Sequence, residues 1–169
     1  LYTLFIGPPE KDAEWIDTSV VGSHKFLRRL WAIIEENADK IKNSNLYDSD
    51  GNDIDKDNKR LLCKIHQTIK KVVDDIDKSF HFNTSVAAVM ELTNELKNVA
   101  AVDDRILKTF AETILKLLAP FVPHIVEELW EIIDNTDTIF KQKFPEFDNR
   151  FIIFDEITVV VQINGKVRS

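Results

Sequence analysis

Two sets of basic side chains repeat at helical spacing and could hold a polyanion. The first set lies between residues 56 and 71, at steps of four, four, three and four that place its members on one helix face. Its members are Lys56, Arg60, Lys64, Gln67 and Lys71, with His66 and Lys70 flanking the row. Lysine and arginine in register can contact successive phosphates of a nucleic acid. The same pattern is also typical of a solvated helix face, so spacing alone leaves both interpretations open.

The second basic set lies earlier in the chain. Lys25 and Arg29 share a row, and His24 and Arg28 lie beside them. The net charge of the chain is −7, which argues against a protein that coats nucleic acid through a broad positive field. Local basic rows on an acidic body are still compatible with phosphate contacts, so the distribution of charge matters more than its sum.

Metal-binding patterns occur only as incomplete matches. The stretch from Asp48 to Asp53 is similar to a calcium loop, but Asp53 stands at the sharp-turn glycine position and Lys59 at the closing acid position. Cys63 and His66 have half the spacing of a zinc site, and no second cysteine or histidine pair completes it. We therefore expect no metal site and expect Cys63 to pack near the core.

No pattern in the sequence predicts a complete catalytic site. None of the four histidines follows a glutamate by three residues, so a carboxylate-bridged di-iron bundle is not expected. Glycine-rich phosphate loops, nucleophile elbows and zinc-protease motifs are absent from the sequence. Glu127 and Glu128 lie near His124, but their spacing is typical of the solvent face of an amphipathic helix. We expect no catalytic residue and no cofactor in this chain.

The elements that must position the basic rows are predicted to form an all-α helical bundle. Apolar residues recur at three- and four-residue steps and predict helices over about 20–41, 57–78, 85–99 and 103–118. Residues 125–133 are predicted to form a fifth short helix or a kinked continuation of the fourth. Asn83, Thr84 and Ser85 offer caps for the third helix. Residues 1–18 are expected to be extended or irregular, because Pro8 and Pro9 oppose a helix. A short C-terminal β segment is predicted over 151–163, with a hairpin turn at 164–165.

Composition limits the class of protein. The chain has 169 residues, 44% of them hydrophobic and 30% charged, which is typical of one globular domain. No apolar run approaches the roughly 20 residues needed to span a bilayer, and no leader pattern is present. Cys63 is the only cysteine, so no internal disulfide is possible. We expect a cytoplasmic protein.

Several blocks occur in the order found in one enzyme family. They are LYTLFIGPPEKDAEW at 1–15, KFLRRLW at 25–31, HQTIKKV at 66–72, FNTSVAAVMEL at 82–92, LAPFVPHIVEELW at 118–130 and VQINGKVR at 161–168. Together they resemble bacterial-type leucyl-tRNA synthetases, which are class I aminoacyl-tRNA synthetases. The 118–130 block is shared with the isoleucine, valine and methionine enzymes, whereas the 161–168 block is close to specific for the leucine enzyme.

The resemblance implies a division of the chain and a role for it. It implies the tail of a catalytic domain at 1–18, a helical anticodon-binding domain at 19–135, and a linker with the first strand or hairpin of a C-terminal domain at 136–169. Such a domain supports leucine tRNA by contacting the backbone and body of the tRNA. The longer enzyme that contains this domain would be a monomeric ligase that does not associate with membranes. It would attach leucine to tRNA with ATP and Mg, at a synthetic site outside these residues.

The spacing of the two basic rows and the resemblance together predict which side chains contact tRNA. They are Lys25, Arg28, Arg29, Lys64, His66, Lys70, Lys71, Lys166 and Arg168. The family usually has arginine at position 25, so Lys25 keeps the charge but loses the bidentate fork. Two alternatives stay open: a free-standing helical interaction module with solvated basic faces, and the equivalent domain of an isoleucine or valine enzyme. The 161–168 block argues against the second alternative.

Overall fold

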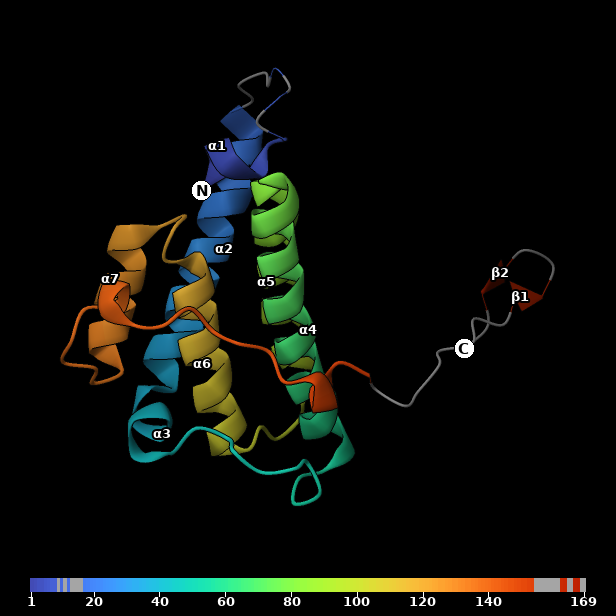
Figure 1. Ribbon diagram of the computed structural model, residues 1–169, viewed down its shortest axis with the longest axis vertical. Coiled ribbons are helices and arrows are strands. Elements are labelled where there is room, and N and C mark those ends of the chain that lie inside the picture. The colour runs from blue at the N-terminus through green and yellow to red at the C-terminus, as the bar shows by residue number, and fades with distance from the viewer. Residues whose placement is uncertain (9, 11, 13–16, 154–161, 164–165, 168–169) are drawn as a thin grey trace.

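The chain folds as a bundle of helices with a short strand pair near its C-terminus, as the computed structural model shows (Figure 1). The structure describes residues 1–8, 10, 12, 17–153, 162–163 and 166–167. Its elements are α1 Tyr2–Phe5, α2 Asp17–Glu36, α3 Ala38–Asn43, α4 Lys56–Ser79, α5 Phe82–Glu95, η1 Leu96–Asn98, α6 Asp104–Leu118, α7 Pro123–Ile132, η2 Ile139–Lys141, η3 Asn149–Phe151, β1 Gln162–Ile163 and β2 Lys166–Val167. The predicted all-α class is confirmed. Within the described ranges, no helix combines the length and the apolar character needed to cross a membrane.

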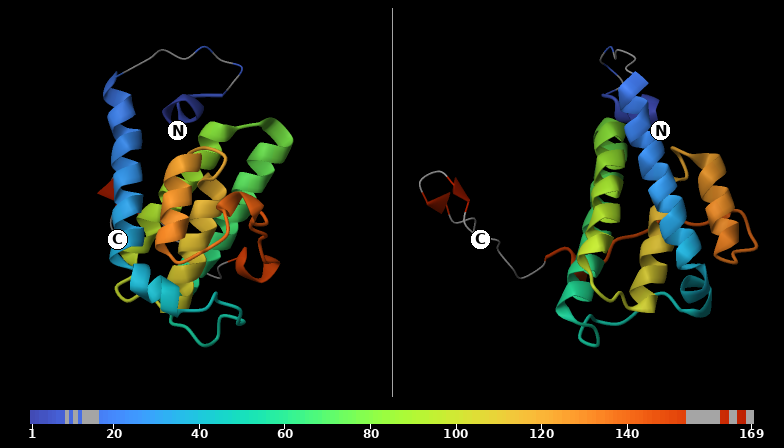
Figure 2. Two further views of the ribbon diagram at one scale, coloured as in Figure 1. Left: turned by 90° about the vertical axis from the view of Figure 1, so that its left-hand side faces the viewer. Right: turned by 180° about the vertical axis from the view of Figure 1, so that it is seen from behind.

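The core forms where α4, α5 and α6 pack together. The predicted apolar face of α4 is confirmed, because Leu62, Ile65, Ile69 and Val72 are all at most 2% exposed. Phe110 of α6 is completely buried among them. Figure 2 shows α2 along one edge of the bundle, where it contacts α1, α3 and α7. One face of α2 therefore packs inward while its opposite face is open to solvent.

The structure corrects two predictions near the N-terminus. The helix predicted over 20–41 is two helices, because α2 ends at Glu36 and α3 begins at Ala38. At the junction the Asn37 side chain donates a hydrogen bond to the Ile33 carbonyl at 2.8 Å, and the turn lets Ile41 bury itself completely. Residues 2–5 form the short helix α1, not an extended run. An apolar run this short does not distinguish helix from strand, and here the turn packs against α5.

Two further predictions are wrong at element boundaries. The N-cap of α5 is His81, and its side chain makes no capping hydrogen bond. Thr84 and Ser85 lie inside the helix and donate their hydroxyl hydrogens to the His81 carbonyl. The predicted β segment does not begin at Phe151, which belongs to η3. The hairpin itself agrees with the prediction, since β1 and β2 pair antiparallel on either side of residues 164–165.

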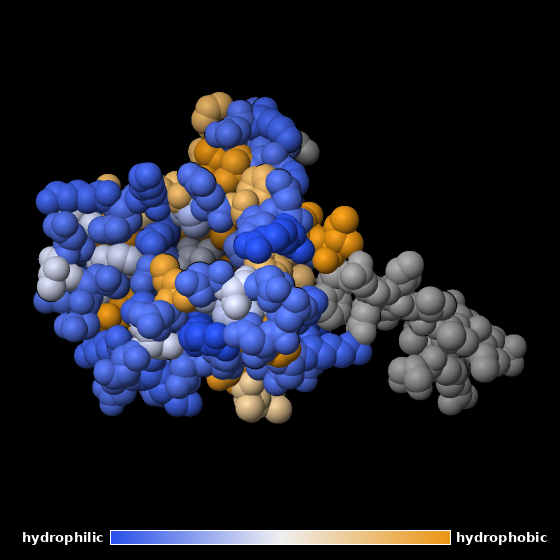
Figure 3. Space-filling model, turned by 60° about the horizontal axis from the view of Figure 1, so that its bottom comes forward, coloured by the Kyte–Doolittle hydropathy of each residue, from blue (hydrophilic) through white to orange (hydrophobic). Residues whose placement is uncertain are grey.

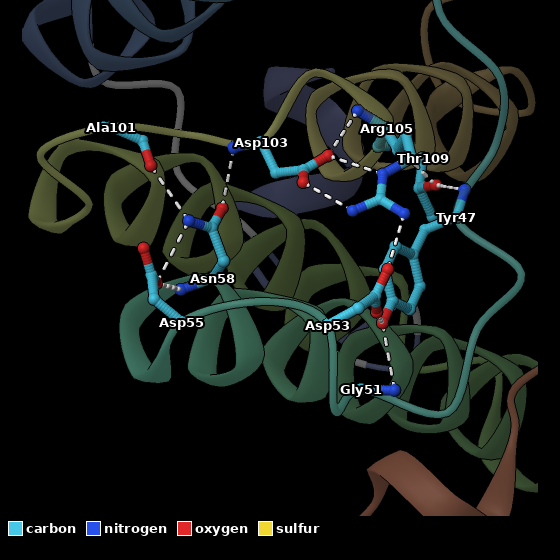
Figure 4. A network of polar contacts seen from close by, with 9 residues as sticks. All are labelled: Tyr47, Gly51, Asp53, Asp55, Asn58, Ala101, Asp103, Arg105 and Thr109. Carbon is cyan, nitrogen blue, oxygen red and sulfur yellow. Dashed lines mark hydrogen bonds and ion pairs between the residues drawn. The ribbon is translucent and has the colours of Figure 1, made fainter.

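The loop between α3 and α4 is fixed to the start of α6 by polar contacts (Figure 4). Arg105 donates to Asp53 at 2.7 Å and to Asp103 at 2.7 Å, and its guanidinium lies over the Tyr47 ring. Hydrogen bonds from Tyr47 and Arg105 hold the pKa of Asp53 below its usual value. The Asp-rich stretch that is similar to a calcium loop thus directs this carboxylate toward partners in the protein itself.

Gly51 lies at a point of close approach within this loop. Its φ of +85° is in the left-handed region, and a Cβ atom there would lie 3.1 Å from Phe151 Cε1. We expect Gly51→Ala to lower the free energy of unfolding by about 1–2 kcal/mol, because both the backbone and the space disfavour a side chain. Chemical denaturation of the 169-residue chain measures this change.

Gly22 provides the matched control for that substitution. It lies within α2, and an added Cβ would meet nothing within 4 Å. Gly22→Ala should leave stability unchanged or raise it by up to about 1 kcal/mol, since alanine is the better helix former. Equal losses in both variants would contradict the close approach at Gly51.

Candidate nucleic-acid interface

The basic row of α4 is paired with carboxylates of α5. Arg60 Nε donates to Glu95 at 2.8 Å, and Lys64 Nζ lies 3.2 Å from Glu91. The two acids occupy one side of α5 at i and i+4, and α4 packs against that helix over much of its length. Each positive charge of this part of the row is therefore offset by a neighbouring negative charge.

The C-terminal half of the row is paired within α4 itself. Lys70 and Lys71 contact Asp74 and Asp75 respectively, each at 2.6 Å and four residues away. Hydrogen bonds from Lys70 and Lys78 lower the pKa of Asp74 to about 2. The Asp74 carboxylate therefore stays ionised at neutral pH. Because Lys70 and Lys71 are both paired with a carboxylate, they present little unbalanced charge to a phosphate.

His66 is covered by the C-terminal part of the chain. Its ring stacks on Phe151 with centroids 5.1 Å apart, and its Nδ1 accepts a hydrogen bond from the Asp148 amide at 3.1 Å. Burial lowers the pKa of His66; the Asp148 carboxylate opposes that change and Arg150 adds to it. The imidazole is therefore neutral and engaged within the protein, which the spacing of the sequence did not predict.

The α2 row has a different character. Lys25 and Arg28 are exposed, Arg29 is half-buried, and within the described ranges none of the three forms an ion pair or hydrogen bond. The Arg29 guanidinium lies over the Phe26 ring at 5.9 Å, while its Nε atom is buried without a partner. Phe26 is 4% exposed and anchors this turn of the helix in the core. The row thus presents positive charge from a rigid support.

The structure therefore separates the two predicted rows. Lys25, Arg28 and Arg29 are brought together on α2, whereas Lys64, His66, Lys70 and Lys71 are engaged by other groups. The side chain of Lys166, in β2, and all of Arg168 lie outside what the structure describes, so their roles stay predictions. The pairs of Lys70 and Lys71 with acids four residues on could have been read from the sequence. The pairs with α5 could not, because they depend on helix packing.

One face of the molecule lacks the broad apolar patch that is typical of a protein-docking surface. Figure 3 brings the bottom of Figure 1 forward and shows a largely hydrophilic surface with scattered hydrophobic side chains. A groove of about 380 Å³ between α4 and α5 is lined by Lys64, Lys71, Thr84, Glu91 and two alanines, among others. The Lys64–Glu91 ion pair lies in this groove beside apolar side-chain surface, so it is a groove of mixed character between two packed helices.

Comparisons of the sequence and the structure with known proteins all identify tRNA ligases as similar proteins. Residues 58–169 match the family described as the anticodon-binding domain of tRNA ligase. The whole chain is 41% identical to leucine–tRNA ligases of Fusobacterium nucleatum subsp. nucleatum and of Fervidobacterium nodosum, and covers 20% and 21% of them. A solved ternary complex of Agrobacterium radiobacter K84 agnB2 LeuRS with tRNA and LeuAMS matches with a TM-score of 0.82 at 28% identity. That match covers 99% of this chain and 21% of the other. The chain thus spans about a fifth of the length of the curated relatives it matches.

Proposed function

Because this chain belongs to the family of anticodon-binding domains of tRNA ligases, we propose that it is the part of a leucine–tRNA ligase that supports the tRNA. The ligase would attach leucine to its tRNA with ATP and Mg at a synthetic site in another part of the protein. The likeness over the whole chain to leucine–tRNA ligases, and to a LeuRS that was solved with tRNA, supports this proposal.

The observation that carries the proposal is the contrast between α2 and α4. A phosphate contact gains most from a cation that has no competing carboxylate, because binding then releases counterions without breaking an ion pair. Lys25, Arg28 and Arg29 meet that condition. In this proposal they are the principal contacts to the tRNA backbone. Lys64 and Lys71 form a weaker second row, and the ring of His66 has another role.

The proposed organisation divides the chain into three parts, with the first boundary inside the first turn of α2. Residues 1–18 would belong to the tail of the catalytic region, 19–135 to the tRNA-supporting bundle, and 136–169 to the linker and first hairpin of a C-terminal part. The parent ligase would be a cytoplasmic monomer that acts on leucine tRNA. Phosphate contacts on α2 would fix the position of the tRNA without reading its sequence, because such contacts carry no base information.

Reversing one exposed charge on α2 tests the role in tRNA binding. In the full-length protein we expect Arg28→Glu to raise the KM for leucine tRNA roughly tenfold, because a favourable phosphate contact becomes a repulsive one. Leucine-dependent exchange of pyrophosphate into ATP should not change, since that step does not require tRNA. Steady-state leucylation and pyrophosphate exchange, assayed side by side, measure both effects.

Lys97→Glu is the control, because Lys97 is an exposed cation on η1 whose side chain has no ion-pair or hydrogen-bond partner among the described residues, and the substitution makes the same change of charge. Its KM for tRNA should stay within about twofold of the wild type. A free-standing interaction module predicts no effect of Arg28→Glu on any tRNA-dependent step. Exchange that depends on isoleucine or valine, and not on leucine, would show that the parent is a different ligase.

A further inference from the structure

A short segment near the C-terminal end of the described chain packs across α4, a helix from which it is distant in sequence. This segment, residues 147–152, contains η3 and lies against the middle of α4 (Figure 1). Gln67 Nε2 donates a hydrogen bond to the Ile152 carbonyl at 2.8 Å, and Lys70 Nζ lies 5.5 Å from the centre of the Phe147 ring. Both ends of the segment are therefore held by side chains of one helix.

His66 lies at the centre of this attachment. Its Nδ1 accepts the Asp148 amide hydrogen, and its ring stacks on Phe151, which is only 4% exposed. An imidazole can accept a hydrogen at Nδ1 only when that nitrogen carries no proton. The attachment therefore depends on neutral His66.

The loop before α4 packs against the other side of Phe151. The site formed around the Phe151 ring by His66 and Gly51 is called the seat below. Gly51 approaches Phe151 so closely that a Cβ atom would lie 3.1 Å from the ring. The Gly51 amide donates to the Tyr47 hydroxyl at 2.9 Å, and Arg105 of α6 lies over the Tyr47 ring. The Phe151 ring thus fits between a histidine on a long helix and a loop that is itself fixed to the core.

The position of the seat determines where the chain leaves the bundle. The last buried side chain before the segment is Ile139, and residues 140–144 are all exposed. Directly after the segment, Ile153 is 74% exposed. Without the seat, Ile139 would be the last residue anchored in the core, and the chain that follows it would be free to move relative to the bundle. With it, the point of departure is fixed at Ile152.

We propose that His66 is a positioning residue, which fixes the exit point of the C-terminal part of the chain so that this part meets the tRNA held by α2. The proposal rests on the proposed function. A tether that is fixed at Ile152 restricts the space that the following part explores, which raises its effective concentration at the bound tRNA. His66 acts through residues 147–152 and does not touch the RNA.

Two substitutions separate the hydrogen bond from the ring stack. His66→Phe keeps an aromatic ring against Phe151 but has no acceptor for the Asp148 amide. His66→Asn restores an acceptor near the position of Nδ1 and has no ring and no titration near neutral pH. Hydrogen exchange of the peptide covering 147–152, measured in the full-length protein, reports on the seat. KM for leucine tRNA reports on positioning.

After correction for the intrinsic exchange rate, the wild type should lose protection of this peptide as the pH falls below about 6.5, the ordinary pKa of histidine. Burial lowers the pKa of His66 while the segment is attached, so protonation below that pH favours the detached state. The charged groups that act on the His66 ring are Asp148 and Arg150 of the segment, while Lys70 of α4 lies over the neighbouring Phe147 ring. The pKa of Asp148 is lowered to about 2 and the pKa of Arg150 is raised, so neither group titrates in this range. His66→Phe should exchange roughly five- to tenfold faster at neutral pH, with no pH-dependent step. His66→Asn should recover part of the protection, also without that step.

The KM for tRNA tests whether the seat positions the C-terminal part of the chain relative to the tRNA. We expect His66→Phe to raise the KM for tRNA roughly three- to tenfold, with partial rescue in His66→Asn and unchanged pyrophosphate exchange. Faster exchange of 147–152 with an unchanged KM would overturn the positioning role and leave the proposed function intact. Unchanged exchange in His66→Phe would overturn the seat itself. A wild type that cannot attach leucine to tRNA would refute the proposed function instead.

Discussion

Replacing Lys25, Arg28 and Arg29 together by glutamine is expected to weaken binding of leucine tRNA to the full-length protein about 10- to 100-fold at physiological salt. Each residue is a cation without a carboxylate partner among the described residues, so each loss removes one phosphate contact and no internal ion pair. The Arg29 stack on Phe26 contributes packing that glutamine only partly replaces. Fluorescence anisotropy with labelled tRNA, at one fixed salt concentration, measures the change.

A second triple variant controls for net charge. Lys40, Lys42 and Lys97 are exposed cations on α3 and η1 and not members of the α2 row, and their replacement by glutamine changes the net charge by the same amount. This variant should bind tRNA within about threefold of the wild type, because only distant, screened charge is lost. Equal weakening in both variants would mean that overall charge, and not the α2 row, holds the tRNA.

The Asn58→Ala variant is expected to lose about 3 kcal/mol of unfolding free energy. Asn58 is 3% exposed, and its amide donates to the Ala101 carbonyl while its Oδ1 accepts from the Asp103 amide, both at 2.9 Å (Figure 4). Removing it leaves a carbonyl and an amide without partners where α4 meets the start of α6. Chemical denaturation of the 169-residue chain, followed by circular dichroism, measures the loss.

Asn52→Ala is the matched control for this prediction. Asn52 is exposed in the loop, and among the described residues its side chain hydrogen-bonds only to Asp50, at 2.8 Å. Its replacement should change stability by less than about 0.5 kcal/mol. Similar losses in the two variants would show that the bridge to α6 contributes no more than a surface turn does.

Periodic burial made the long helices predictable from the sequence. Along α4, side chains that recur at three- and four-residue steps are buried as expected, because a single helix face satisfies them all. The break at Asn37 was not predictable, since it depends on the packing of α3 against α6, with Ile41 of α3 completely buried. The cap of α5 was misplaced because Thr84 and Ser85 bind the preceding carbonyl from inside the helix.

The candidate site shows the same limit. Both basic rows have good spacing, and spacing cannot tell which row has acidic neighbours. Glu91 and Glu95 reach the α4 row only because α5 packs beside it, and η3 covers His66 from more than 80 positions away in the sequence. The α2 row stays open because α2 lies at an edge of the bundle. Tertiary packing, rather than residue type, therefore selects the row proposed to meet RNA.

The salt dependence of tRNA binding tests the central claim most directly. For the wild-type full-length protein, the logarithm of the binding constant should fall linearly with the logarithm of salt concentration. Replacing Lys25, Arg28 and Arg29 by glutamine should reduce the magnitude of that slope by about two to three, the value for three lost phosphate contacts. The variant that replaces Lys40, Lys42 and Lys97 should keep the wild-type slope. An unchanged slope after removal of the α2 cations would contradict the account that this face of the bundle holds the tRNA.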